Sequence, residues 1–249
     1  MKLARSSLLA LALSIALVAP ASAHQPVVLS ATDAKLQRSL IFVDGTVSWA
    51  VTADLPKSGA VRYFRFALTE GEALQVEYLI KDRKPERTLT VNQLPKITVT
   101  TPSGRSIPIR INERTKFFEP YSKTRYLFLS RIAKKGEAGI YSVAIRAASA
   151  ASVIVAIGSR ETRSEALRIG TSPGNCPLPI GEGVEIPADV AGQLVGLSER
   201  AASVCATANR WSYRIASRDG ESFPLTMDYR FDRLNFKIED GNVIDVIVG

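Results

Sequence analysis

Apolar and polar positions divide the chain into parts with different periodicity. Between about residues 40 and 158, apolar side chains alternate with polar ones in short runs; Phe64, Phe66 and Leu68 share one face of such a run. Alternation over four to eight residues predicts half-buried strands, and Gly-containing turns separate them. We predict strands at 62–68, 74–80, 96–101, 107–111, 125–132, 140–147 and 152–157. Strands at this spacing, without a strong helix pattern between them, favour an antiparallel jelly-roll β-sandwich in a mainly β fold.

The last third of the chain combines a helix pattern with three strands. From residue 187 to 208, apolar residues recur every three and four positions, which predicts an amphipathic helix. Gly196 and Ser198 interrupt it, so two short helices with Ser198 capping the second are the alternative. Strands are expected at 211–216, 231–238 and 243–248. The chain is thus divided into a sandwich at 24–160, a Gly/Pro-rich linker at 161–185 and a small α+β domain at 186–249.

The first 23 residues have the pattern of a secretory signal peptide. Lys2 and Arg5 precede an apolar run from residue 8 to 18, and Ala21-Ser22-Ala23 is a small-residue cleavage site. No other apolar run reaches the length of a membrane span. We expect an exported protein, periplasmic or secreted, whose mature chain begins at His24.

Cysteines and charge separate the two halves further. Cys176 and Cys205 are the only cysteines, and in an oxidising compartment one disulfide between them is the simplest interpretation. Residues 24–172 contain 23 Lys/Arg against 13 Asp/Glu, a net of +10, whereas residues 173–249 contain 7 against 11, a net of −4. The basic half could bind an anionic component of the cell envelope, but it has no nucleic-acid-binding signature. Within it, the basic and aromatic stretch 110–121 is either a polysaccharide or partner site or, preferably, a strand edge with buried Phe and solvated Lys/Arg.

The histidine content excludes most catalytic arrangements. His24 is the only histidine, so Ser-His-Asp and Cys-His sites and multi-histidine metal centres are not available. No phosphate-binding loop or Ser-x-x-Lys constellation is visible. We therefore expect a binding protein without cofactor or metal; an enzyme using carboxylates or a Ser-Lys pair is the least favoured reading.

The sandwich has three distinctive features: the string Phe64-x-Phe-x-Leu-x-x-Gly71, the turn formed by Thr101, Pro102 and Gly104, and the stretch from Glu137 to Val143. Together they resemble the bacterial pre-peptidase C-terminal domain. That domain is a small jelly roll attached to exported proteases and other surface enzymes. The resemblance implies an accessory role in binding or positioning.

The acidic half is expected to contain a helix, a strand, a long loop, a strand, a tight turn and a strand in this order. It also has five notable sequence features: Cys176, Gly196, Thr226-Met-Asp-Tyr-Arg230, Asp232-Arg-Leu-Asn235 and the final Gly249. In this order and in these features it resembles the potato inhibitor I family of serine protease inhibitors, which includes eglin, and within it the small bacterial exported branch.

This resemblance implies that the loop from Pro224 to Phe231 binds a protease. Met227 would enter the S1 pocket, and the Met227–Asp228 bond would face the catalytic serine. Leu225 and Thr226 would occupy the non-primed subsites, with Tyr229 on the primed side. An apolar Met suits subtilisin-, chymotrypsin- or elastase-like targets rather than trypsin-like ones.

The resemblance also assigns supporting residues. Arg230 and Arg233 match basic positions that reach back under the loop towards Thr226 and Asp228. Asn235 stands where eglin has a further supporting arginine, which predicts one brace fewer and a looser loop, open to weak inhibition or to cleavage. A non-inhibitory structural or adaptor protein that keeps the fold is therefore the alternative function.

Overall fold

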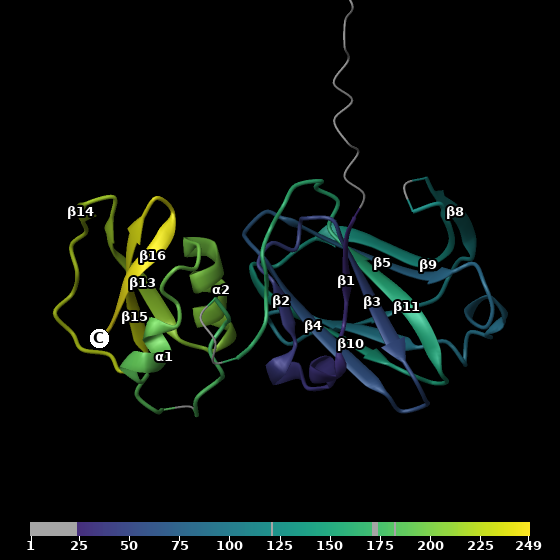
Figure 1. Cartoon of the computed structure of the whole chain (residues 1–249), viewed down its shortest axis with the longest axis horizontal. Helices are drawn as coiled ribbons and strands as arrows, with labels where there is room; N and C mark the ends of the chain where they lie inside the picture. Colours follow the sequence, from purple (N-terminus) through teal and green to yellow (C-terminus); the bar gives the residue numbers. More distant parts are fainter. Residues whose placement is uncertain (1–23, 121, 171–173, 182) are drawn as a thin grey trace, which may run out of the picture.

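The computed structural model describes residues 24–120, 122–170, 174–181 and 183–249; the predicted signal peptide lies outside these residues. The chain is mainly β, with a large two-sheet sandwich followed by a small unit in which helices pack on a third sheet (Figure 1). The predicted fold class is confirmed.

Each sandwich sheet has six strands. The first sheet has the order β1-β3-β11-β5-β9-β8, comprising β1 (Gln25–Val28), β3 (Trp49–Leu55), β5 (Ala73–Lys81), β8 (Thr115–Glu119), β9 (Thr124–Lys135) and β11 (Ala151–Ile157). The second has the order β12-β2-β4-β10-β6-β7, comprising β2 (Leu40–Phe42), β4 (Val61–Leu68), β6 (Lys96–Thr100), β7 (Ser106–Ile109), β10 (Gly139–Arg146) and β12 (Ala166–Leu167). Three short 3-10 helices join them: η1 (Ala31–Ala34), η2 (Leu36–Arg38) and η3 (Glu86–Thr88).

Two pairings depart from the expected antiparallel pattern. β1 runs parallel to β3, and β2 runs parallel to β4. The first four strands alternate between the two sheets. Each crossing reverses the chain direction, so every second strand returns to the same sheet in the same direction.

The sandwich core follows the alternation in the sequence. Phe64 and Phe66 on β4 and Tyr141 and Val143 on β10 are buried between the sheets. Successive side chains of a strand point to opposite faces, so the residues between them lie on the outer face of the second sheet. That outer face carries both the contact with the C-terminal unit and an open groove, described below.

The basic and aromatic stretch at 110–121 contains the edge strand β8, but the expected burial of its phenylalanines is wrong. Phe117 and Phe118 are 37% and 52% exposed. β8 packs mainly on its neighbour β9, at the end of the sheet farthest from the C-terminal unit (Figure 1). An edge strand has one unpaired hydrogen-bonding side, and in β8 both faces are also largely exposed, so its side chains lie outside the core.

The C-terminal unit has a four-stranded sheet in the order β14-β13-β15-β16. Its elements are α1 (Ala188–Gly192), α2 (Glu199–Ala208), β13 (Ser212–Arg218), β14 (Glu221–Ser222), β15 (Arg233–Glu239) and β16 (Asn242–Val248). The two-helix alternative holds: Ser198 Oγ accepts a hydrogen bond from the Ala201 amide and caps α2. The Cys176–Cys205 disulfide ties the segment before the unit to α2, with the Cα atoms 5.4 Å apart.

Helix α2 lies between the sheet of the C-terminal unit and the sandwich (Figure 1). Its buried residues share one apolar cluster with Leu234 and Phe236 of its own sheet and with Ile41 and Val43 from the sandwich. Ion pairs flank this contact, with Arg200 Nη1 3.0 Å from the Asp44 carboxylate. The C-terminal unit therefore completes its core against the sandwich.

The segment predicted as a linker takes part in this contact. It contains β12, which pairs with β2, and Leu167 is buried in the shared cluster. Arg168 Nη1 lies 2.7 Å from the fully buried Asp33 carboxylate. These contacts hold the part of the segment up to Gly170 on the sandwich.

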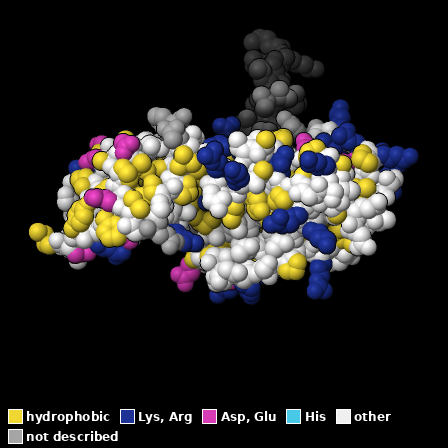
Figure 2. Space-filling model, turned by 90° about the horizontal axis from the view of Figure 1, so that it is seen from below, with side chains coloured by type: hydrophobic (Ala, Val, Ile, Leu, Met, Phe, Trp, Pro, Cys, Tyr) yellow, Lys and Arg dark blue, Asp and Glu magenta, His cyan; other side chains and the backbone are white. Residues whose placement is uncertain are grey.

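The surfaces of the sandwich and of the C-terminal unit carry different kinds of side chain. Figure 2 shows Lys and Arg spread over the sandwich, whereas hydrophobic side chains gather on the C-terminal unit. No helix in the ranges that the structure describes is both long and apolar enough to cross a bilayer.

Candidate functional site

The loop between β14 and β15 crosses the polar face of the C-terminal sheet. Leu234, Phe236 and Ile238 point into the core beneath α2, so Arg233 and Asn235 lie on the opposite face. β13 and β15 are parallel neighbours while β14 lies on the other side of β13. A parallel pair needs a crossover, and here the loop itself makes it.

The two ends of the loop are fixed by backbone hydrogen bonds. The Phe223 amide donates to the Ala216 carbonyl (2.9 Å), and the Ile186 amide donates to the Phe231 carbonyl (3.1 Å). Between these anchors the chain has no helix or strand. The loop forms the end of the molecule opposite the sandwich (Figure 1).

Met227 is the most exposed large hydrophobic side chain of the described residues. It is 100% exposed, whereas Leu225 is 41% and Tyr229 64% exposed. Pro224, which fixes one backbone angle at the start of the loop, is also exposed. A fully exposed apolar side chain gains no burial energy from folding, so the Met227 side chain is free to contact another molecule.

Arg214 on β13 holds the loop on one side of Met227. Its Nη1 donates to Thr226 Oγ1 (2.8 Å) and its Nη2 donates to the Thr226 carbonyl (3.4 Å). Its Nε donates to Asn235 Oδ1 (2.5 Å). The guanidinium therefore connects the loop to a buried amide on the neighbouring strand.

Arg233 on β15 holds the loop on the other side. Its Nη1 donates to Asp228 Oδ2 (3.0 Å), and its Nη2 donates to the Asp228 carbonyl (2.6 Å). Its Nε donates to the Gly249 carbonyl (2.8 Å). Arg233 is only 8% exposed, so the side chain that holds Asp228 is itself fixed by the surrounding residues. We call each of the two arginines, Arg214 and Arg233, together with its hydrogen bonds to the loop, a clamp.

Asn235 joins the two clamps. Its Nδ2 donates to the Gly249 carbonyl (2.7 Å) and to the Ile247 carbonyl (2.9 Å), while its Oδ1 accepts from Arg214. The hydrogen bonds thus run from Thr226 through Arg214, Asn235 and the Gly249 carbonyl to Arg233 and Asp228. Thr226 and Asp228, which flank Met227, are therefore held by one continuous network of hydrogen bonds.

These bonds also set the protonation of the loop. Hydrogen bonds from Thr226 and then from Arg233 lower the pKa of Asp228 to about 2. The Tyr229 hydroxyl donates to Glu185, which raises the pKa of Tyr229. At neutral pH the loop therefore keeps the carboxylate that Arg233 binds.

The structure changes the expected bracing in two ways. Arg230 does not reach Thr226 or Asp228 in the described contacts; its guanidinium lies 3.1 Å from the Asp232 carboxylate, on the surface. Arg214, which the sequence analysis did not select, binds Thr226 instead. The only sequence signal for it is a charged residue inside a run otherwise read as a half-apolar strand.

Asn235 consequently has a different role from the one expected. It was interpreted as a lost brace, but it orients Arg214 by accepting from Nε. It is 5% exposed, so its amide is fully committed to the network. The loop has two arginine clamps although one of them comes from an unexpected strand.

Comparison with known proteins gives no family. No family model and no curated protein matches the chain. One similar solved structure is a family GH115 4-O-methyl-α-glucuronidase with specificity for decorated arabinogalactans, at 13% identity and a TM-score of 0.28. The match covers 53% of this chain and 17% of that enzyme, so the chain spans a small part of the enzyme's length. A likeness this distant carries no argument about activity.

Proposed function

We propose that the protein is an exported inhibitor of serine proteases. Residues 224–231 would bind the protease as a substrate does, with Met227 in the S1 pocket and the Met227–Asp228 bond facing the catalytic serine. The observation that carries this proposal is the fully exposed Met227 between two residues that are each clamped by an arginine.

Bracing supports inhibition because a flexible loop loses entropy when it binds. A loop that is already ordered before the protease binds avoids much of this entropic cost. The same cost ordinarily lowers the affinity of a flexible peptide ligand. Hydrogen bonds from a guanidinium are charge-assisted and directional, and they can order a loop that has few packing contacts. After a cut at Met227–Asp228, the clamps on Thr226 and Asp228 would keep the two ends together, so religation would compete with release.

The exposed side chain defines the target class. Methionine is flexible and apolar, so it fits medium or large apolar S1 pockets. Subtilisin-, chymotrypsin- and elastase-like proteases have such pockets, whereas trypsin-like proteases require a positive charge. We therefore expect inhibition of the first three and none of trypsin.

The test uses the full mature chain, because the C-terminal unit shares its core with the sandwich. The chain is titrated against subtilisin, chymotrypsin, elastase and trypsin, with Met227→Gly in parallel. Removing an apolar side chain that is buried on binding should weaken inhibition by about 10- to 100-fold. Val91→Gly, which removes an exposed apolar side chain from the sandwich, is the matched control and should leave inhibition unchanged.

Two results would reject the proposal. One is the absence of inhibition of all three apolar-pocket proteases at micromolar concentration. The other is rapid, complete cleavage after Met227 without inhibition. Either would favour the alternative, a structural or adaptor protein of the envelope that keeps the fold.

A further inference from the structure

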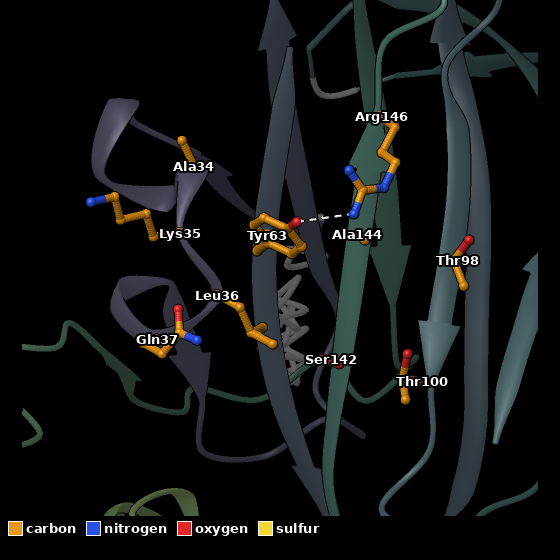
Figure 3. A pocket seen from close by; sticks show the side chains of 10 residues that line it. All are labelled: Ala34, Lys35, Leu36, Gln37, Tyr63, Thr98, Thr100, Ser142, Ala144 and Arg146. Atoms are coloured by element: carbon orange, nitrogen blue, oxygen red, sulfur yellow. Dashed lines mark hydrogen bonds between the residues drawn. The ribbon is translucent and has the colours of Figure 1, made fainter. Parts of the chain in front are cut away.

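An open groove lies on the outer face of the second sandwich sheet, beside the part of that face that α2 covers. Its volume is about 540 Å³, within the range of roughly 300–1,000 Å³ common for small-ligand sites. The strands β4, β10 and β6 form the floor, and η1 and η2 form one wall (Figure 3). The lining residues are Ala34, Lys35, Leu36, Gln37, Tyr63, Thr98, Thr100, Ser142, Ala144 and Arg146.

Hydroxyl groups dominate the floor. Thr98 and Thr100 on β6 and Ser142 on β10 are half-buried neighbours, since Ser142 pairs with Thr100 across the strands. Each hydroxyl can both donate and accept a hydrogen bond. The amide of Gln37 adds a further donor and acceptor on the wall. This set suits a ligand with many hydroxyl groups rather than an acyl chain or an apolar peptide.

One end of the groove combines an aromatic ring with a cation. Arg146 Nη2 donates to the Tyr63 hydroxyl (3.2 Å), and the guanidinium carbon lies 6.0 Å from the Tyr63 ring centre. Figure 3 shows the two side chains meeting above the floor. This hydrogen bond uses one guanidinium N–H, so other donors of the exposed Arg146 can form a bidentate contact with a carboxylate.

The lining of the groove is basic. Lys35 and Arg146 belong to it, Arg146 over the floor and Lys35 with its ammonium group turned away from the floor (Figure 3), and none of the described lining residues is acidic. A third cation, Arg65, lies on the same sheet face and pairs across the strands with Ser142. Arg65 is 8% exposed, and its Nε has no hydrogen-bond partner among the described residues.

Burial leaves the Arg65 charge poorly compensated. Its Nη2 donates to the Ser39 carbonyl (3.3 Å), and desolvation lowers its pKa to about 10. The nearby acid on η1, Asp33, is committed to Arg168 at 2.7 Å. A buried cation without a carboxylate partner raises the electrostatic potential around it and favours an anion nearby.

We propose that this groove binds an acidic oligosaccharide, a chain of sugars that carry carboxylates. Hydroxyls of the sugar would bond to Thr98, Thr100 and Ser142, and the C–H face of one ring would pack on Tyr63. A carboxylate would bind Arg146. The groove lies on the sandwich and the Met227 loop on the C-terminal unit, so the protein could hold a surface polysaccharide while its loop stays free.

The experiment measures binding by calorimetry with the full mature chain at physiological ionic strength. The probes are oligomers of galacturonic, mannuronic and glucuronic acid, the matching neutral oligomers, and acetate. We expect at least one acidic oligomer to bind at least 10-fold more tightly than its neutral counterpart, and acetate not to displace it at the same concentration of carboxylate.

Variants locate the site. Arg146→Gln should weaken binding about 10-fold, because a charged hydrogen bond is lost, and Thr98→Val about 5-fold, because it removes one hydroxyl at nearly constant shape. Lys116→Gln, on β8 of the other sheet, removes the same charge as Arg146→Gln and should leave affinity within 2-fold. The melting temperature of each variant checks its folding.

Four outcomes would overturn the proposal. They are no binding of any acidic oligomer, equal binding of acidic and neutral oligomers, full competition by acetate, and equal losses in Arg146→Gln and Lys116→Gln. The last would show a diffuse charge effect over the basic sandwich. None of these outcomes depends on whether the loop inhibits proteases.

Discussion

Arg214→Ala tests the part of the loop support that the sequence analysis missed. The change removes two hydrogen bonds to Thr226 and one to Asn235. A charged hydrogen bond contributes about 1.5–3 kcal/mol, but Thr226 is exposed, so solvent reduces the loss to about 1–1.5 kcal/mol. That free energy corresponds to about 5- to 10-fold in the fraction of molecules with an ordered loop.

Two measurements report this change. The inhibition constant for subtilisin should rise about 5- to 10-fold, and mass spectrometry should show faster cleavage after Met227 by about the same factor. The second measurement is informative even for a protease that the protein does not inhibit. Arg218→Ala is the matched control, because it removes the same charge from the same strand, outside residues 224–231, and breaks an exposed pair with Glu199.

Arg218→Ala should change neither quantity by more than about 2-fold, as is usual for an exposed ion pair. Equal effects of Arg214→Ala and Arg218→Ala would refute the bracing argument, because general charge would then explain both. An unchanged cleavage rate in Arg214→Ala would refute it as well. Melting curves of both variants separate a local change in the loop from a loss of the fold.

Three further predictions concern the same unit. Arg233→Ala should accelerate cleavage after Met227 more than Arg214→Ala does, because Arg233 is buried and also binds Gly249; a smaller effect would contradict the network. The carboxyl of Asp228 has a pKa lowered from 3.8 to about 2, so its contribution to loop order should be complete above about pH 4 and lost as pH falls through 2. The NMR chemical shifts of the loop amides should follow this titration, and in Asp228→Asn this titration step should be absent. Replacing Cys176 and Cys205 by serine opens a link across 29 positions and should lower the free energy of unfolding by about 3 kcal/mol in urea titrations; an unchanged midpoint would argue against it.

Local pattern was sufficient for much of the fold. Alternation located β4, β5 and β9–β11, because a strand with one covered face must alternate. The alternation pattern did not predict β2, because all three of its residues are buried. The sandwich core covers one face of β2, and the C-terminal unit covers the other. The bond between Cys176 and Cys205 followed from their number alone.

The candidate site shows the limit of such reasoning. The loop residues around Met227 were proposed from a resemblance to a known family, and Arg233 lies where that resemblance implied. Arg230 follows the same sequence logic but points to Asp232 on the surface. A string of residues specifies which side chains are available, but not which of them face the loop.

The sequence by itself determined which residues share a strand face and which residues form the exposed loop, and it offered Ser198 as a helix cap as one of two alternatives. These properties depend on neighbours a few positions apart. The tertiary structure decided that β13 lies parallel to β15, with Arg214 opposite Asn235, and that β10 sits between β4 and β6 to form the groove floor. Strand partners and register come from burial of apolar faces between distant segments, so the clamp on Thr226 and the acidic-sugar groove exist only after the chain has folded.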